Sequence, residues 1–235
     1  GRIELILKNS ARWLKFFLAL ILGLGTISQV HAISLVRNDI LLHIVAQCVD
    51  PAKENYCVNC AFPRADKSCN GVTECKKTNE VWELTDKYVA IRDIKMCGCP
   101  ASFVHGLSMP RRVVTGVEDV NKEEDIWQFA WTAGLERIEP SSLALVVNPK
   151  SERTQNQLHV HMLRLNSNSR EMFASYSHAY VRSLDLVWVV AQKIAVANGL
   201  VDYGVLVAKD GSSQYIVVVT KHSPEAAFTI WNCHN

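Results

Sequence analysis

The stretch Gln157-Leu158-His159-Val160-His161-Met162-Leu163 alternates strictly between polar and apolar side chains. Because successive side chains of a β-strand point to opposite faces, this alternation predicts a strand with one apolar and one polar face. The apolar face is expected to point into a core and consists of Leu158, Val160 and Met162. The polar face is expected to be exposed and to carry three side chains next to one another: Gln157, His159 and His161.

Two imidazoles two residues apart on one strand face can act on the same ligand atom. A neutral imidazole attacks phosphorus as a nucleophile. The second imidazole, with the Gln157 amide and nearby backbone N–H groups, can stabilise the phosphoryl oxygens. A run of hydrogen-bond donors suited to an oxyanion comes before the strand: Asn148, Arg153, Thr154, Gln155 and Asn156. The pattern therefore favours phosphoryl chemistry.

Two other interpretations of the histidine pair stay open. Exposed histidines are common, so the pair is also compatible with a solvated edge strand without a function. A His-x-His pair on a strand is also a frequent metal-ligand pair, but no third ligand, such as a paired downstream His or Glu, stands out in the sequence. We therefore predict neither a metal nor a cofactor.

The segments around this strand predict an α+β fold, because helices mix with short strands without a regular βαβ alternation. Helices are expected at 34–49, 123–138 and 184–197, and strands at 88–91, 103–107 and 143–147. Strands at 203–207 and 215–219 form a predicted hairpin around Asp210-Gly211. In the helix at 123–138, we expect Asn121 to be the N-cap and Trp127 and Trp131 to lie in the core.

Residues 1–32 have the three-part order of a secretion signal. Lys8, Arg12 and Lys15 precede an apolar run at 16–25, and Ser28–Ala32 follows with small or apolar residues where a signal peptidase cleaves. An apolar run of about ten residues is short for a membrane span. We predict a signal peptide or an uncleaved N-terminal anchor, and hence a protein that is periplasmic or anchored to the inner membrane facing the periplasm.

All eight cysteines follow this segment, and seven of them lie between residues 48 and 99. An even number of cysteines in an exported chain indicates disulfides, and we expect Cys233 to tie the chain end to this region. Zinc stays open as an alternative, because Cys57-x-x-Cys60 and Cys97-x-Cys99 have ligand-like spacings. The connectivity of the disulfides cannot be deduced from the sequence.

The length and charge limit the possible classes of protein. A chain of 235 residues suits one compact domain, which we predict at 33–235, with a cysteine-rich segment at 33–100 and a core at 101–235. The formal net charge of +2 is far from that of a nucleic-acid binder, so we predict no nucleic-acid partner. The chain contains neither a P-loop nor a dinucleotide-binding glycine motif.

The alternating strand resembles the histidine-triad (HIT) motif His-φ-His-φ-His-φ-φ, where φ is apolar, with Gln157 at the first position. The longer stretch from Asn148 to His161 is similar to the corresponding stretch of CDP-diacylglycerol pyrophosphatases. Five further segments also look like parts of that family: Leu107–Pro110, Thr115–Glu118, Trp127–Ala133, His178–Tyr180 and Tyr203-Gly204. The similarity covers roughly residues 85–221.

The resemblance implies a HIT-like antiparallel sheet with packed helices. It also implies hydrolysis of CDP-diacylglycerol to CMP and phosphatidate through a nucleotidyl-histidine intermediate, without a cofactor. His159 corresponds to the nucleophile and His161 to the third triad histidine, which contacts the phosphate. Thr154 corresponds to a hydroxyl that points to the phosphate, Asn148 matches an asparagine of the site, and Arg153 is a candidate phosphate clamp or a solvent-facing arginine.

The sequence departs from the family pattern at Gln157, because a glutamine donates a hydrogen bond but does not relay a proton. Two other functions share these residues: a HIT-type hydrolase or transferase that acts on another nucleotide, and a non-catalytic, disulfide-stapled nucleotide-binding module. The expected partners are a CDP-lipid or nucleotide substrate and a membrane near the N-terminal segment. The oligomeric state is not predicted.

Overall fold

The computed structural model describes residues 38–45, 64–65, 79–96 and 98–233. The chain divides into two units, Gly1–Ile40 and Leu41–Asn235, and the architecture below is that of the second unit. The predicted secretion segment and most of the cysteine-rich region lie outside the described residues. Among the residues that are described, no helix combines the length and the apolar character needed to cross a membrane.

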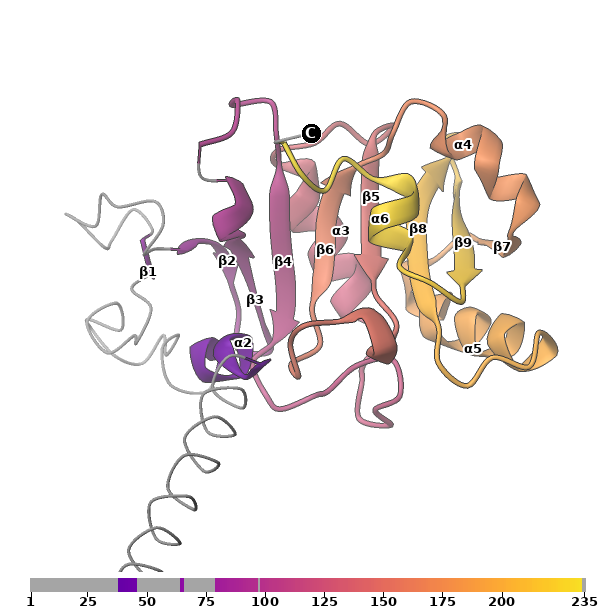
Figure 1. The fold of residues 1–235 in the computed structure, drawn as a ribbon, viewed down its shortest axis with the longest axis horizontal. Coiled ribbons are helices and arrows are strands. Elements are labelled where there is room, and N and C mark those ends of the chain that lie inside the picture. The colour runs from indigo at the N-terminus through magenta and orange to yellow at the C-terminus, as the bar shows by residue number, and fades with distance from the viewer. Residues whose placement is uncertain (1–37, 46–63, 66–78, 97, 234–235) are drawn as a thin grey trace, which may run out of the picture. The chain divides into compact units, whose positions relative to one another are not determined.

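A nine-stranded sheet forms the centre of the second unit, in the order β1-β2-β3-β4-β6-β5-β8-β9-β7 (Figure 1). Neighbouring strands pair antiparallel, except that β1 and β2 are parallel. The strands are β1 Arg64–Ala65, β2 Asn79–Leu84, β3 Tyr88–Arg92, β4 His105–Pro110, β5 Leu143–Val147, β6 Val160–Arg164, β7 Ser177–Val181, β8 Gly204–Asp210 and β9 Gln214–Thr220. The largely antiparallel sheet with few helices confirms the predicted α+β class.

Short helices cover both faces of the sheet. The α-helices are α2 Ile40–His43, α3 Ile126–Leu135, α4 Ser169–Met172, α5 Val187–Ala197 and α6 Pro224–Phe228. The 3-10 helices are η4 Ile94–Met96, η5 Lys150–Glu152, η6 Phe173–Ser175 and η7 Leu184–Leu186. In Figure 1, α6 crosses the face of β5 and β8 that is turned to the viewer, and α3 lies behind the sheet.

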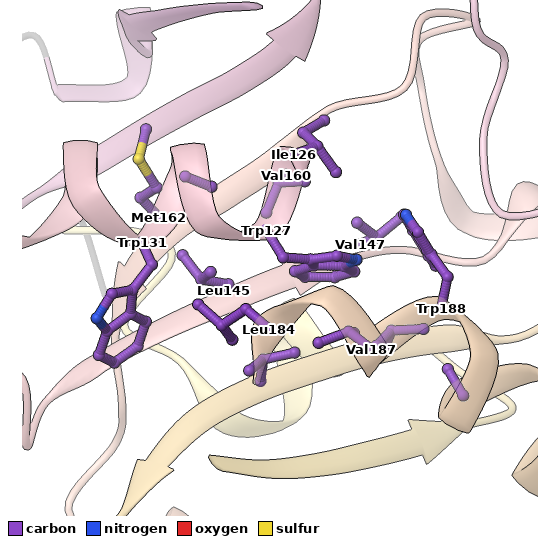
Figure 2. Packing of buried hydrophobic residues seen from close by; sticks show 14 of the residues in the cluster. Ile126, Trp127, Trp131, Leu145, Val147, Val160, Met162, Leu184, Val187 and Trp188 are labelled. Carbon is purple, nitrogen blue, oxygen red and sulfur yellow. The ribbon is translucent and has the colours of Figure 1, made fainter. Parts of the chain in front are cut away.

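The larger core lies between the sheet and the pair α3 and α5. Figure 2 shows Trp127 and Trp188 beside Leu145, Val147 and Val160, and the two indole ring centroids are 4.7 Å apart. A Cβ at Gly134 of α3 would crowd the side chain of Leu143, so this glycine allows α3 to approach β5 closely. Trp127 and Trp131 are buried, as predicted.

A second core lies on the opposite face, under α6 and η6. Its strand residues alternate with those of the larger core, because period-two side chains separate onto the two faces of a sheet. The cluster includes Ala144, Val146, Leu206, Ala208, Val218, Phe173 and Phe228. On β6, Val160 and Met162 belong to the larger core, so His161 points to the α6 face.

Several predicted elements appear with shifted bounds. The alternating strand begins at Val160 rather than Gln157, and β4 begins at His105 rather than residue 103. The helix expected at 123–138 is limited to 126–135, and Asn121 is not its cap, since Asp125 occupies that position. The reason is that residues 123–125 serve other partners: Glu124, for example, accepts hydrogen bonds from the backbone of Trp188 and Val189 in the first turn of α5.

The strand at 143–147 has the predicted bounds, and β3, the helix at 184–197 and the hairpin agree closely with prediction, with Gly211 at φ 64° in the turn. Of the helix expected at 34–49, only residues 38–45 are described, and they contain α2. The strands β2 and β7 and the helix α6 were not predicted as elements.

A disulfide joins Cys99 to Cys233, with Cα atoms 5.8 Å apart. It confirms that Cys233 ties the chain end to the cysteine-rich region. It also shows that Cys99 is not a zinc ligand, because a disulfide sulfur carries no thiolate. Cys57, Cys60 and Cys97 lie outside the described residues.

Candidate active site

A pocket of about 210 Å³ opens where the start of β6, the loop after β5 and helix α6 meet. Most of the residues that line it are of polar types, and the lining consists of Lys95, Asn148, Glu152, Arg153, Thr154, His159, His161, Ser223, Glu225, Ala226 and Trp231. The pocket therefore brings together five of the eight residues that the sequence singled out. Gln155, Asn156 and Gln157 are not part of this lining.

His159 lies just before β6, and its ring orientation is fixed by its own backbone. Nδ1 is 2.7 Å from the carbonyl oxygen of Gln157. A carbonyl only accepts, so Nδ1 carries the hydrogen and Nε2 keeps a lone pair. Burial lowers the pKa of His159 below its ordinary 6.5, although the hydrogen bond to Gln157 opposes this change. At neutral pH the ring is thus neutral, with a free nucleophilic nitrogen.

His161 lies on β6, where its neighbours are Leu107 on β4 and Val146 on β5. Its ring stands edge-on to that of His159, with the centroids 4.8 Å apart. Burial, followed by the charges of His159 and His105, holds the pKa of His161 well below its ordinary value. Its Nε2 is buried and has no hydrogen-bond partner among the described residues.

Two residues that the sequence analysis missed lie beside His161: His105 and Glu225. His105 on β4 is fully buried, and its Nε2 lies 2.9 Å from Nδ1 of His161. Glu225 on α6 places Oε1 3.6 Å from His105 Nε2 and 3.5 Å from His161 Nδ1. A lone histidine in the predicted strand at 103–107 was a signal for the first. No signal pointed to Glu225, because α6 was not predicted.

Asn148 connects this group to the pocket rim. Its amide donates to Glu225 Oε2 at 2.6 Å, and its Oδ1 accepts from the hydroxyl of Ser223 at 2.8 Å. The structure thus places Asn148 at the site, as predicted, but one of its amide hydrogens already holds Glu225 in position. The other amide hydrogen has no partner in the part of the chain that the structure describes and can serve a ligand.

Gln157 does not lie exposed beside the two histidines as the alternation predicted. It is fully buried, and its amide donates to the carbonyls of Pro110 at 2.9 Å and Arg112 at 2.8 Å. Its Oε1 accepts from the backbone of Val114 at 3.3 Å. Both amide hydrogens therefore serve the backbone after β4, and neither is free for a phosphate.

Arg153 lines the pocket, but its charge is already matched. Its guanidinium donates two hydrogen bonds to Glu118, at 2.8 and 2.6 Å, and its side chain is only 9% exposed. A solvent-facing Arg153 is therefore excluded. Burial opposes ionisation of Glu118, but the bonds from Arg153 outweigh it and lower the pKa of that carboxyl. A Cβ at Gly116 would collide with the guanidinium, so the glycine makes room for this pair.

The three residues that follow Arg153 in the sequence, 154–156, have different surroundings. Thr154 is exposed and lines the pocket, as the resemblance implies. Gln155 instead accepts a hydrogen bond from the backbone of Leu41 at 3.0 Å, which ties the loop to α2. Asn156 is exposed and lies outside the pocket lining.

Lys95 is a pocket cation that the sequence analysis did not single out. Its Nζ lies 3.7 Å from Glu225 Oε1 and 5.3 Å from the ring centre of Trp231. The side chain is 47% exposed, so it is free to turn towards an anion in the pocket. With Arg153 matched by Glu118, Lys95 is the better placed of the two to meet a phosphate.

The chain is similar to a family of known proteins and, at low identity, to a solved structure. The model of the CDP-diacylglycerol pyrophosphatase family matches residues 37–184. The crystal structure of yeast Ap4A phosphorylase Apa2 in complex with AMP aligns with a TM-score of 0.40 and 16% identity. That alignment covers 60% of this chain and 59% of the yeast chain, so the chain spans about three-fifths of that protein's length. No curated protein gives a significant match.

Proposed function

The chain belongs to the CDP-diacylglycerol pyrophosphatase family, and we propose that it hydrolyses CDP-diacylglycerol to CMP and phosphatidate through a covalent intermediate on His159. The observation that carries the proposal is the bond from His159 Nδ1 to the Gln157 carbonyl, which leaves the lone pair on Nε2 of a residue that lines the pocket. Family membership supports the hydrolase activity, and the geometry supports His159 as its nucleophile.

In the first step, His159 Nε2 attacks the phosphorus that carries the cytidine. A P–N bond forms, the bond to the bridging anhydride oxygen breaks, and phosphatidate leaves with the electron pair. The ring becomes a cation when Nε2 is bonded to phosphorus, and the Gln157 carbonyl, 2.7 Å from Nδ1, stabilises that charge. Splitting the reaction at a covalent intermediate replaces one difficult step with two easier ones.

In the second step, water attacks the same phosphorus and the P–N bond breaks. CMP leaves, the imidazole returns to its neutral form, and one proton of the water is released. The phosphoryl oxygens need hydrogen-bond donors during both steps. Those available at the pocket are the Lys95 ammonium, the Thr154 hydroxyl, the remaining amide hydrogen of Asn148 and His161 Nε2, when it carries the hydrogen.

The substitution His159→Ala tests the proposal. It should reduce CMP release from CDP-diacylglycerol by about 1,000-fold or more, the usual scale for loss of a covalent nucleophile. Substrate labelled at the cytidyl phosphate should label the wild-type chain during a single turnover and leave the variant unlabelled. Undiminished release from the variant would contradict the role of His159.

His178→Ala is a matched control, because His178 also bonds through Nδ1 to the carbonyl two residues earlier, at 2.8 Å. It does not line the pocket, so the variant should keep full activity. CDP-alcohol and dinucleotide substrates, run beside the lipid, test the substrate class. Faster turnover of either would favour a nucleotide hydrolase that acts on a soluble substrate.

We also propose that the segment 1–32 brings the enzyme to the membrane where a CDP-lipid resides. The basic residues followed by an apolar run at 16–25 support this location. Fractionation of cells that express the full chain tests this location. Recovery of the chain entirely in the cytosol would contradict it.

A further inference from the structure

We propose that His105, His161 and Glu225 form a binding site for a divalent transition-metal ion of the zinc type. The three residues come from β4, β6 and α6, and each is buried. The existence of this site does not depend on the proposed hydrolase activity. The site shares only His161 with the His-x-His pair of the sequence analysis, because His159 is not a member of this cluster.

The geometry of the three facing atoms fits a metal. His105 Nε2, His161 Nδ1 and Glu225 Oε1 lie 2.9, 3.6 and 3.5 Å from one another. A point about 2 Å from all three atoms exists, and zinc binds histidine nitrogen and carboxylate oxygen at about 2.0–2.2 Å. Two histidines and one carboxylate are also the ligand set of one type of zinc site with an open fourth position.

The hydrogen bonding of the cluster also points to a cation. A single hydrogen between the two ring nitrogens satisfies those atoms but leaves Glu225 Oε1 buried without a hydrogen-bond partner among the described residues. Such a buried oxygen is unfavourable by about 1–3 kcal/mol. A metal at the centre would bond all three atoms at once.

The surroundings hold the carboxylate ligand in place. The second oxygen of Glu225 accepts from Asn148, which Ser223 orients in turn. Such outer contacts are typical of metal ligands, because they fix the orientation of the coordinating group. Asp93 Oδ2, 3.6 Å from His105 Nε2, adds negative charge beside the cluster. The charge of Lys95 opposes a cation, but this half-exposed side chain can turn away.

Coordination through Nδ1 would fix the hydrogen of His161 on Nε2. That atom would then be a donor for a phosphoryl oxygen, a consequence that rests on the proposed function. The two neighbouring histidines would thus present opposite groups: a lone pair on His159 and an N–H on His161.

Direct zinc binding tests the site. The purified full chain is stripped with chelator, without reductant so that the Cys99–Cys233 disulfide stays closed, and titrated with Zn²⁺ in a calorimeter. Glu225→Gln and His105→Asn should each weaken binding at this site by more than about 100-fold, because even outer-shell partners of a metal commonly contribute 10–100-fold. Mg²⁺ should not compete, since it prefers all-oxygen sites.

Glu171→Gln and His178→Asn are the matched controls, since both residues lie outside the cluster, and they should bind Zn²⁺ as the wild type does. Co²⁺ provides a second readout: the wild type should show tetrahedral visible bands without a thiolate charge-transfer band, and Glu225→Gln should lose them. Thermal unfolding of the stripped variants separates a lost ligand from a lost fold, and Glu225→Gln keeps the size of the side chain if His105→Asn does not fold.

Equal zinc affinity and stoichiometry in the wild type and in both ligand variants would overturn the site. So would a cobalt spectrum that contains only thiolate bands. CMP release is measured separately on the same samples, so a failed metal site with intact hydrolysis leaves the proposed function standing. Zinc binding by a chain that releases no CMP supports the site and contradicts the function.

Discussion

The two faces of strand β6 contrast sharply, although the strand is only five residues long. On one face, Val160 and Met162 are completely buried in the larger core, and their one side-chain hydrogen bond among the described residues is the bond that the Met162 sulfur accepts from Ser108. On the other, His161 and its neighbour Glu225 carry buried polar atoms without hydrogen-bond partners among the described residues. Each such atom lowers the stability of the fold. We therefore infer that the first face stabilises the fold, and that the second face serves the reaction at a cost in stability.

Trp127→Ala should have the largest effect on the apolar side of this comparison. Trp127 is fully buried, and its indole N–H has no hydrogen-bond partner among the described residues, so the substitution removes packing alone. The free energy of unfolding should fall by about 3–5 kcal/mol. Urea unfolding measures this change, and turnover per folded molecule should stay near that of the wild type.

Val189→Ala on α5 is the control, because Val189 is 46% exposed and should contribute less than about 0.5 kcal/mol. A loss below about 1 kcal/mol for Trp127→Ala would mean that the α3 packing does not hold the sheet.

His161→Asn should show the opposite pattern. The rate of CMP release should fall about 100- to 1,000-fold, the usual scale for loss of one donor to a developing oxyanion. Stability in chelator should fall by about 1–2 kcal/mol, less than for Trp127→Ala, because the lost hydrogen bond to His105 Nε2 is partly offset by removal of a buried unpartnered Nε2. Single-turnover assays measure the rate of CMP release, and urea unfolding of the same sample measures the stability. A rate that falls only in proportion to the unfolded fraction would contradict the division between the faces.

The sequence was sufficient for the apolar face because that face depends on local periodicity. The bounds of β5 and the burial of Trp127 and Trp131 follow from apolar runs and helical spacing, which burial then enforces. The hairpin of β8 and β9 follows from Asp210-Gly211, since Gly211 takes the positive φ that the turn requires.

The polar face was only partly predictable, because its members come from distant parts of the chain. His159 and His161 were found from the alternation, but His105 meets them only through the pairing of β4 with β6. Glu225 depends on where the short helix α6 comes to lie. The wrong prediction that Gln157 is exposed has a similar origin. Its amide donates to the carbonyls of Pro110 and Arg112, and the sequence around Gln157 does not show that these carbonyls lie nearby.

Gln157→Ala tests that explanation, with an effect between those of the two faces. It removes three hydrogen bonds and leaves the backbone groups of Pro110, Arg112 and Val114 without this partner. We expect the free energy of unfolding to fall by about 2–3 kcal/mol. Gln128→Ala, at an exposed glutamine whose side chain donates to Thr132, should change it by less than about 0.5 kcal/mol. A large loss of CMP release without a loss of stability would instead restore Gln157 as a direct phosphate ligand.

The smallest expected effect lies at the solvent end of β6, where Arg164 pairs with Glu139. Hydrogen bonds from Arg164 and Ser142 lower the pKa of Glu139 from its ordinary 4.5 to about 2. The pair therefore stabilises the fold above pH 4.5 and loses this contribution as the pH falls towards 2. Because Glu139 is exposed, its pairing should contribute less than about 1 kcal/mol. Glu139→Gln should thus be slightly less stable than the wild type in urea at neutral pH, and the difference should vanish on acidification. A difference that persists or grows in acid would mean that the carboxylate charge is not what holds this end of the strand, and that packing governs β6 along its whole length.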